Sequence, residues 1–161
     1  RMIAAVLRAI YLKPAHRSPM EAVPRARLRA RTGLEGNVEQ GSRRQITLVE
    51  EERWERFMLA LGGKHPVSAR RANLVVRGID LSAGRGGRLL RVGTCRIRIL
   101  GETRPCERMD ALLPGLERAM SADWGGGAFG VAVDDGDIQV GDLLSWDSPD
   151  APAILRADPA A

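Results

Sequence analysis

Short strand-like stretches, each closed by Gly, Pro or Asp, recur along this chain and restrict its fold more than any other feature. In CRIRIL, residues 95–100, apolar and cationic residues alternate with the period of a half-buried strand. Between two later stretches, DDGD at residues 134–137 predicts a hairpin turn. The pattern predicts strands at Ile3–Leu12, Ala26–Ala30, Gln45–Val49, Leu74–Ile79, Leu89–Val92, Cys95–Leu100, Gly130–Val133, Ile138–Val140 and Leu143–Trp146.

One helix is clearly marked from residue 50 to about residue 61. Three glutamates occupy its first turn, where carboxylates complement the helix dipole, and a glycine pair ends it. Its apolar stripe, with spacing i, i+3, i+4 and i+7, consists of Trp54, Phe57, Met58 and Leu61. A shorter helix is expected from Gly115 to Met120. Many short strands with few helices predict a mainly β fold that is a closed or nearly closed β-barrel.

The composition is typical of one globular domain. The chain has 161 residues, of which 44% are hydrophobic and 28% charged, so it can bury a substantial core. We expect a core at residues 2–146 and a loosely ordered tail at residues 147–161, where Ala, Pro and Asp dominate. No apolar run approaches the roughly 20 residues needed to span a bilayer, so no membrane association is expected. Two cysteines are no disulfide framework, which fits a reducing, cytoplasmic location.

The net charge of +5 is unevenly distributed, because residues 1–49 hold ten Arg or Lys against three Glu. This imbalance favours an anionic partner near the N-terminal part. In RARLRAR, residues 25–31, four arginines share one face of a predicted strand, which is either solvated or binds RNA. RNA-binding sheets interleave aromatic side chains among such cations, and aromatics make up only 4% of this chain. The low aromatic content therefore argues against nucleic acid as a partner.

Several common catalytic and metal-binding patterns do not occur in the sequence. His16 and His65 are isolated, no Cys/His spacing suits zinc, and no G-x-S-x-G, Walker loop or H-E-x-x-H is present. GGGAFG at residues 125–130 matches G-x-G-x-x-G, but a strand rather than a helix is predicted to follow it, which excludes the dinucleotide-binding unit. The glycines form either a flexible turn or a cradle of backbone amides for an anion.

The two cysteines occupy different contexts. Cys95 shares a predicted strand face with two isoleucines and is expected in the core. Cys106 lies beyond the end of that strand, on a loop between Arg104 and Arg108. The thiolate is the reactive form of cysteine and cations favour it, whereas two neighbouring glutamates oppose it. Cys106 is thus either a reactive thiol or an unreactive loop cysteine, and no disulfide with Cys95 is expected.

Four parts of the chain, taken in order, resemble the motifs of the MOSC domain, which is found at the C-terminus of molybdenum cofactor sulfurases. GLEGN at residues 33–37 resembles an early Gly-x-x-Gly-Asp turn, and RRQITL at residues 43–48 resembles an Arg-Gln strand leading into a helix. RRANLVVRGIDL at residues 70–81 resembles an Arg-x-Asn-Leu segment. Residues 90–106, followed by residues 126–142, resemble the cysteine strand and closing hairpin. The strength of the likeness comes from the order and spacing of these parts.

The resemblance implies a single MOSC-like domain over residues 1–161, with a barrel like the small barrel domain of pyruvate kinase. It also implies that Cys106 is the catalytic residue, which carries persulfide sulfur or ligates molybdenum held by a pterin dithiolene. A soft thiolate suits such a sulfur-rich metal centre, and arginines can hold the pterin phosphate. The residues expected to bind the molybdenum cofactor (molybdopterin) are Arg44, Arg71, Asn73, Arg104, Arg108, Gly126 and Gly127.

Departures from the family pattern limit these expectations. Asn37 stands where the family has an aspartate. The 161 residues include neither the extra N-terminal barrel of amidoxime-reducing relatives nor a pyridoxal-phosphate sulfurase domain, so any persulfide is expected from a partner such as a cysteine desulfurase. The chain is therefore expected to be a persulfide carrier, or a molybdenum enzyme that reduces N-hydroxylated compounds with a redox partner. The alternative is a non-catalytic barrel that binds an anion or nucleic acid through the N-terminal arginines.

Overall fold

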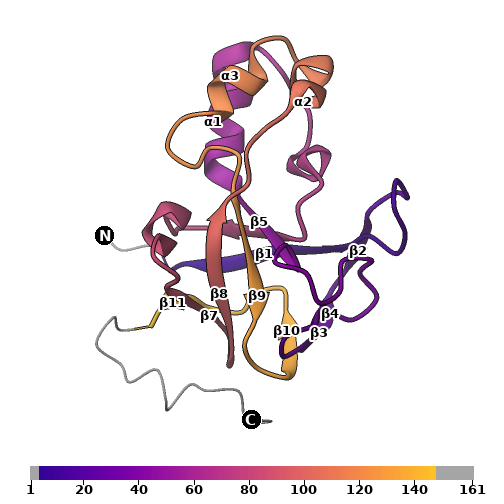
Figure 1. The fold of residues 1–161 in the computed structure, drawn as a ribbon. Helices are drawn as coiled ribbons and strands as arrows, with labels where there is room; N and C mark the ends of the chain where they lie inside the picture. The colour runs from indigo at the N-terminus through magenta and orange to yellow at the C-terminus, as the bar shows by residue number, and fades with distance from the viewer. Residues whose placement is uncertain (1–3, 148–161) are drawn as a thin grey trace.

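A computed structural model describes residues 4–147, in which a strongly curled sheet carries the three α-helices at one end (Figure 1). These residues contain eleven strands, three α-helices and two short 3-10 helices. The strands are β1 (Val6–Leu12), β2 (Glu21–Val23), β3 (Arg25–Arg29), β4 (Gly33–Leu34), β5 (Ile46–Glu50), β6 (Leu74–Arg77), β7 (Leu89–Val92), β8 (Cys95–Glu102), β9 (Ala128–Ala132), β10 (Gly136–Gln139) and β11 (Leu144–Trp146). The helices are α1 (Glu51–Leu61), η1 (Val67–Arg70), η2 (Leu81–Gly84), α2 (Glu107–Leu112) and α3 (Leu116–Met120).

Two sheets make up the β structure. Eight strands pair in the order β11-β7-β8-β9-β5-β6-β1-β2, and a smaller sheet has the order β10-β3-β4. Neighbours are antiparallel except β5 and β6, which run parallel with Val49 opposite Val75. A parallel pair needs a crossover connection, and α1 with η1 provides it. In this crossover, α1 follows the carboxyl end of β5, and η1 lies shortly before the start of β6.

The large sheet is an open half-barrel, which corrects the closed or nearly closed barrel expected from the sequence. Instead of a hydrogen-bonded ladder, β1 and the β11 region share one isolated bridge, between Val6 and Leu143. Three backbone hydrogen bonds flank it, from Leu7 N to the Asp142 carbonyl at 2.9 Å, from Gly141 N to the Leu7 carbonyl at 2.8 Å and from Leu144 N to the Ala5 carbonyl at 2.9 Å. The remainder of β1 pairs with β2 instead. The likeness to the pyruvate kinase barrel stays a prediction.

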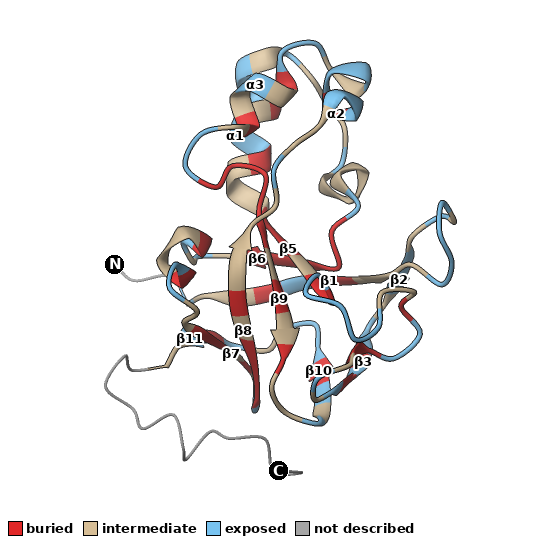
Figure 2. Cartoon of the chain, in the orientation of Figure 1, coloured by how far each residue is buried: buried red, intermediate tan, exposed pale blue. Residues whose placement is uncertain are grey.

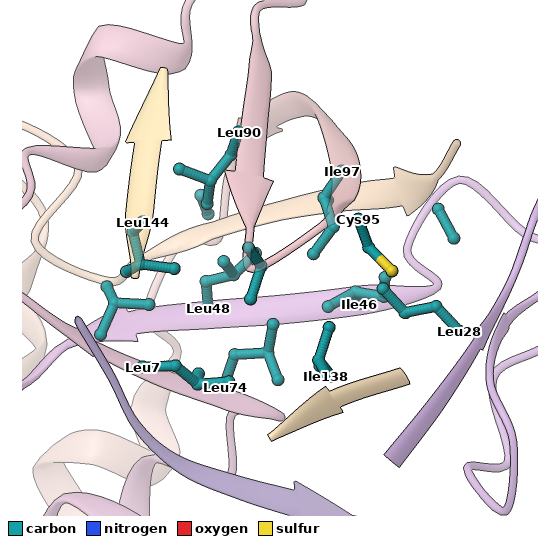
Figure 3. Close-up of a cluster of buried hydrophobic side chains, with 14 of the residues drawn as sticks. Leu7, Leu28, Ile46, Leu48, Leu74, Leu90, Cys95, Ile97, Ile138 and Leu144 are labelled. Carbon is teal, nitrogen blue, oxygen red and sulfur yellow. The ribbon is translucent and has the colours of Figure 1, made fainter. Parts of the chain in front are cut away.

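Apolar side chains from both sheets meet in one core (Figures 2 and 3). Burial follows the alternation of β3, in which Ala26 and Leu28 are buried and the three arginines that alternate with them are exposed. Cys95 is 1% exposed and lies in this core, near Leu28 and Ile46, as predicted. A separate cluster joins the helices, with Trp54 of α1 among its buried members. No helix in residues 4–147 is long and apolar enough to cross a bilayer.

The predicted elements are largely present, with shifted ends. Each of the nine predicted strands has a counterpart, although the first begins at Val6 and its predicted first residue lies outside the described range. The helices at Glu51–Leu61 and Leu116–Met120 are confirmed. Five elements were not predicted, because two to six residues are too few to show a period; they are β2, β4, α2, η1 and η2. The predicted tail lies outside the described residues, apart from Asp147.

A testable prediction concerns the ion pair between Arg96 and Asp134, which joins β8 to the turn after β9. The guanidinium binds the carboxylate through two hydrogen bonds of 2.8 and 2.7 Å, and this lowers the Asp134 pKa below its ordinary value of 3.8. The stabilisation is therefore complete above that ordinary value and is lost as pH falls through the lower folded value. Asp134→Asn should cost roughly 1–3 kcal/mol at neutral pH, with the difference from wild type shrinking in strong acid.

Urea unfolding of both proteins over this pH range measures the effect. Asp123→Asn is the control, because the Asp123 side chain is exposed and belongs to no ion pair among the described residues. An Asp134→Asn penalty that stayed constant into strong acid would contradict the assignment.

Candidate functional site

Cys106 lies in a cavity of about 490 Å³ between the large sheet and the helical end of the molecule. Sites for small molecules usually have volumes of roughly 300–1,000 Å³. The cavity wall has an apolar part, which includes Leu48 of β5 and Met109 of α2. Its charged part contains the carboxylate of Glu39 and the cations Lys13, Arg44, Arg70, Arg71 and Arg108. The cavity therefore attracts anions while offering an apolar surface to the body of a ligand.

The position of Cys106 is set by the helix that follows it. Its backbone is extended, and its carbonyl accepts a hydrogen bond of 2.9 Å from Met109 N, which opens α2. Met109 is buried in the helical cluster against Trp54 and Met58 of α1. The thiol is half-buried and free. Packing of α2 thus fixes the thiol at the cavity wall, and Cys106 lies on the loop directly before this helix, as predicted.

Arg70, at the end of η1, is the main residue of the site that the sequence analysis left out. Its guanidinium donates to the Gly126 carbonyl at 3.1 Å and to the Thr103 carbonyl at 3.2 Å. Burial lowers the pKa of Arg70, the nearby Cys106 raises it, and Arg44 lowers it further. Arg70 therefore joins the glycine loop to the segment that carries the thiol, and its charge acts on both.

Other predicted residues also reach the cavity. Arg71 has a left-handed backbone, with φ of 65°, and its guanidinium donates to the Ser18 carbonyl at 2.7 Å. The guanidinium of Arg44 lies 5.2 Å from the ring centre of Phe129, in a cation–π contact. Arg108 is exposed on the first turn of α2. Together with Gly126, these arginines share one cavity wall with Cys106.

Two of the residues predicted to bind the cofactor do not line this cavity. The Arg104 side chain is 70% exposed and lies 3.8 Å from the carboxylate of Glu102. Gly127 has a φ of 103°, and a Cβ there would lie 2.1 Å from the Leu48 carbonyl, so glycine is required for the close contact with β5. The Gly127 amide donates to the Trp124 carbonyl at 3.0 Å. It is thus engaged within the fold rather than directed at a ligand.

Asn73 also lies outside the lining, in a buried hydrogen-bond network beneath it. Its Oδ1 accepts from the amide and the hydroxyl of Thr47, at 3.0 and 3.1 Å. Its Nδ2 donates to the Tyr11 carbonyl at 3.0 Å and to Asn37 Oδ1 at 3.1 Å. Asn37 Oδ1 also accepts from Lys13 N at 2.8 Å. Asn73 therefore positions Thr47 and Lys13, which do line the cavity. The hydrogen bonds from Asn73 Nδ2 and Lys13 N both end on Asn37 Oδ1, so an amide oxygen suffices at residue 37.

The described residues offer no metal site built from protein side chains alone. In residues 4–147 no three His, Cys, Asp or Glu side chains are grouped so that they could hold a metal ion. A metal bound in this cavity must bring further ligands of its own. Cys106 is the sulfur ligand that the cavity wall provides.

The sequence profile of the MOSC domain matches residues 35–145. This chain belongs to the MOSC domain family. None of the curated proteins matches it. Among solved structures, it is similar to YuaD from Bacillus subtilis, with 18% identity, a TM-score of 0.72, and coverage of 89% of this chain and 96% of YuaD. It is also similar to YiiM from Escherichia coli, with 16% identity, a TM-score of 0.69, and coverage of 91% and 72% respectively.

YiiM from Geobacillus stearothermophilus is a third similar structure. It shares 16% identity with a TM-score of 0.66, and the match covers 94% of this chain and 77% of that protein. At such identities, these similarities show that the MOSC domain of this chain shares its fold with these proteins. The chemistry of the cavity is argued from its own residues.

The Asn73 network predicts a large loss of stability on truncation. Asn73→Ala leaves buried partners in β1 and β5 without a hydrogen bond, at about 1–3 kcal/mol for each buried group. We expect the free energy of unfolding to fall by roughly 2–4 kcal/mol in chemical denaturation. Arg104→Ala, at an exposed residue from the same set of predicted binding residues, should change it by less than about 0.5 kcal/mol. Equal effects of the two substitutions would refute this role.

The two cysteines should differ in reactivity towards a thiol reagent. In native protein, Ellman's reagent should modify Cys106 rapidly, because its side chain reaches the cavity, and Cys95 only on unfolding, because it is 1% exposed. Cys106→Ser should abolish the fast phase, and Cys95→Ala should leave it intact. A fast phase that persisted in Cys106→Ser would overturn the assignment.

Proposed function

We propose that this MOSC domain binds the molybdenum cofactor in the Cys106 cavity, with the Cys106 thiolate as the protein's ligand to the metal. One observation carries the proposal, namely that the thiol shares a single cavity with five cationic side chains. A thiol that only relayed sulfur would need access to solvent but no such enclosure. A cofactor with an anionic phosphate and a sulfur-rich metal centre needs both the cations and the thiol.

The donor set fits this group. Arg44, Arg71 and Lys13 are placed to hold phosphate oxygens, because guanidinium and ammonium groups form charge-assisted hydrogen bonds with them. The apolar wall around Leu48 and Met109 suits a flat organic ring and excludes water. When bound, the molybdenum centre supplies two-electron redox chemistry, and the chain supplies binding and electrostatics. Arg70, fixed by two carbonyl groups, keeps a positive charge near the thiolate.

The reaction that we propose is the reduction of N-hydroxylated compounds. Cleavage of one N–O bond consumes two electrons and two protons and releases water. The electrons must come from a redox partner. Ligation of the metal requires a free thiol at Cys106, and Cys106 is free, in keeping with the proposed cytoplasmic location.

A second function, persulfide transfer, is favoured by the half-exposed state of the thiol. The Cys106 thiolate would attack the outer sulfur of a persulfide on a donor such as a cysteine desulfurase. One S–S bond forms at Cys106 while the donor's S–S bond breaks, and the donor leaves as a thiolate. This transfer needs no metal, which makes the two functions separable.

Elemental analysis of protein from a molybdenum-replete host tests the proposal. We expect about one molybdenum per chain in wild type, loss of the metal in Cys106→Ser, and retention in Cys95→Ala, because Cys95 lies in the core away from the cavity. Cyanide treatment of the same samples measures labile sulfur as thiocyanate. Metal-free protein with cyanide-labile sulfur on Cys106 would favour the carrier, and the absence of both would exclude both functions.

A further inference from the structure

A second hollow adjoins the Cys106 cavity on the side of the loop between β1 and β2. It measures about 690 Å³ and is lined by Lys13, His16, Arg17, Arg71 and Arg108. Three of these cations, Lys13, Arg71 and Arg108, also line the Cys106 cavity, so the two spaces share a wall. None of the residues that line the second hollow is acidic.

The cations of the second hollow are uncompensated. Among the described residues, no carboxylate forms an ion pair with Lys13, Arg17, Arg71 or Arg108. The chain treats its surface arginines on β3 differently, since Arg25, Arg27 and Arg29 are bound by Gln139, Asp137 and Glu35 respectively. Exposed cations this close together repel one another unless an anion lies between them. The absence of a carboxylate partner thus distinguishes these cations from Arg27 and Arg29 of β3.

The loop between β1 and β2, which lines the hollow, is also preorganised by hydrogen bonds at both of its ends. At its start, Lys13 N is bound by Asn37 Oδ1, and the Lys13 carbonyl accepts from Val38 N at 2.7 Å. At its end, the Ser18 carbonyl accepts from Arg71. Arg17 between these anchors has a φ of 63°, an uncommon conformation for a residue other than glycine. Both ends of the loop are therefore fixed to the walls of the cavity, which holds His16 and Arg17 beside it.

We propose that this second hollow binds a phosphoryl group beyond the one that the Cys106 cavity accommodates. Across the two spaces the cationic side chains number six, against the single carboxylate of Glu39, so one phosphate leaves a positive excess; they are Lys13, Arg17, Arg44, Arg70, Arg71 and Arg108. Three guanidinium groups offer forked donors, which match a tetrahedral group with several terminal oxygens. The ligand is a diphosphate or a phosphate monoester, and its binding does not depend on molybdenum.

Two sources share this chemistry. The phosphoryl group belongs either to a nucleotide attached to the bound cofactor or to a separate phosphorylated small molecule. Acid hydrolysis of protein from a molybdenum-replete host, followed by mass spectrometry, distinguishes them. A released nucleotide in proportion to molybdenum assigns the group to the cofactor, whereas pyrophosphate binding without released nucleotide assigns it to a separate molecule.

Calorimetric titration of the full chain, produced without molybdate, with pyrophosphate tests the proposal itself. Arg17 lines only the second hollow, so Arg17→Ala should weaken pyrophosphate binding by about tenfold, the usual scale for a charged hydrogen bond. The matched control, Arg25→Ala on β3, removes an exposed arginine that has a partner and should leave the affinity unchanged.

Four results would overturn the assignment: no binding at millimolar pyrophosphate, equal affinity in Arg17→Ala, equal weakening in Arg25→Ala, or equally tight binding of citrate. The titration uses metal-free protein and does not involve Cys106. A failure of the molybdenum proposal therefore shows in metal content alone, and a failure of this proposal shows in the titration alone.

Discussion

The site depends on the buried amide of Asn73, which precedes β6 and forms four hydrogen bonds. It joins β1 through the Tyr11 carbonyl, β5 through Thr47, and the turn after β4 through Asn37. These polar groups are shielded from water, so each of them needs a hydrogen-bond partner within the protein. The Asn73 side chain provides that partner for all of them. The strand ends that carry Lys13 and Thr47 are consequently held in fixed relation, and the cavity has a rigid floor. Asn73 thus acts on the cavity through placement of the backbone.

The buried Arg96 and the half-buried Arg70 have different functions in this chain, and the difference lies in the groups that accept their hydrogen bonds. Arg96 meets a carboxylate, so its charge is neutralised and the pair stabilises the fold. Arg70 meets only the carbonyls of Gly126 and Thr103, so its hydrogen bonds are satisfied while its charge persists. Burial lowers the pKa of Arg70, yet a guanidinium stays protonated at any ordinary pH. Because its two acceptors are neutral carbonyl groups, Arg70 keeps its full positive charge near Cys106. The cost is the desolvation of a cation that no carboxylate of the described residues neutralises.

The sequence predicted local features well and spatial relations less well. The contrast between Cys95 and Cys106 followed from strand alternation alone, and the core position of Cys95 is confirmed. The sequence could not show that Arg70 and Arg71 have different roles, although they are adjacent. A left-handed backbone at Arg71 directs the two side chains to different partners. Helix α2 was missed since six residues show less than two turns of periodicity. Barrel closure depends on how β1 divides its pairing, which no local pattern encodes.

That division of pairing connects the open sheet to the anion-binding surface. Had β1 continued its pairing with the β11 region, its edge would have been used to close a barrel. Instead only Val6 makes a bridge there, and the second half of β1 pairs with β2. The loop between β1 and β2, which lies on the same side of the molecule as α2 in Figure 1, thereby brings His16 and Arg17 opposite Arg108. The pairing of β1 with β2 thus places cations of the loop between these strands beside the cavity that Cys106 lines.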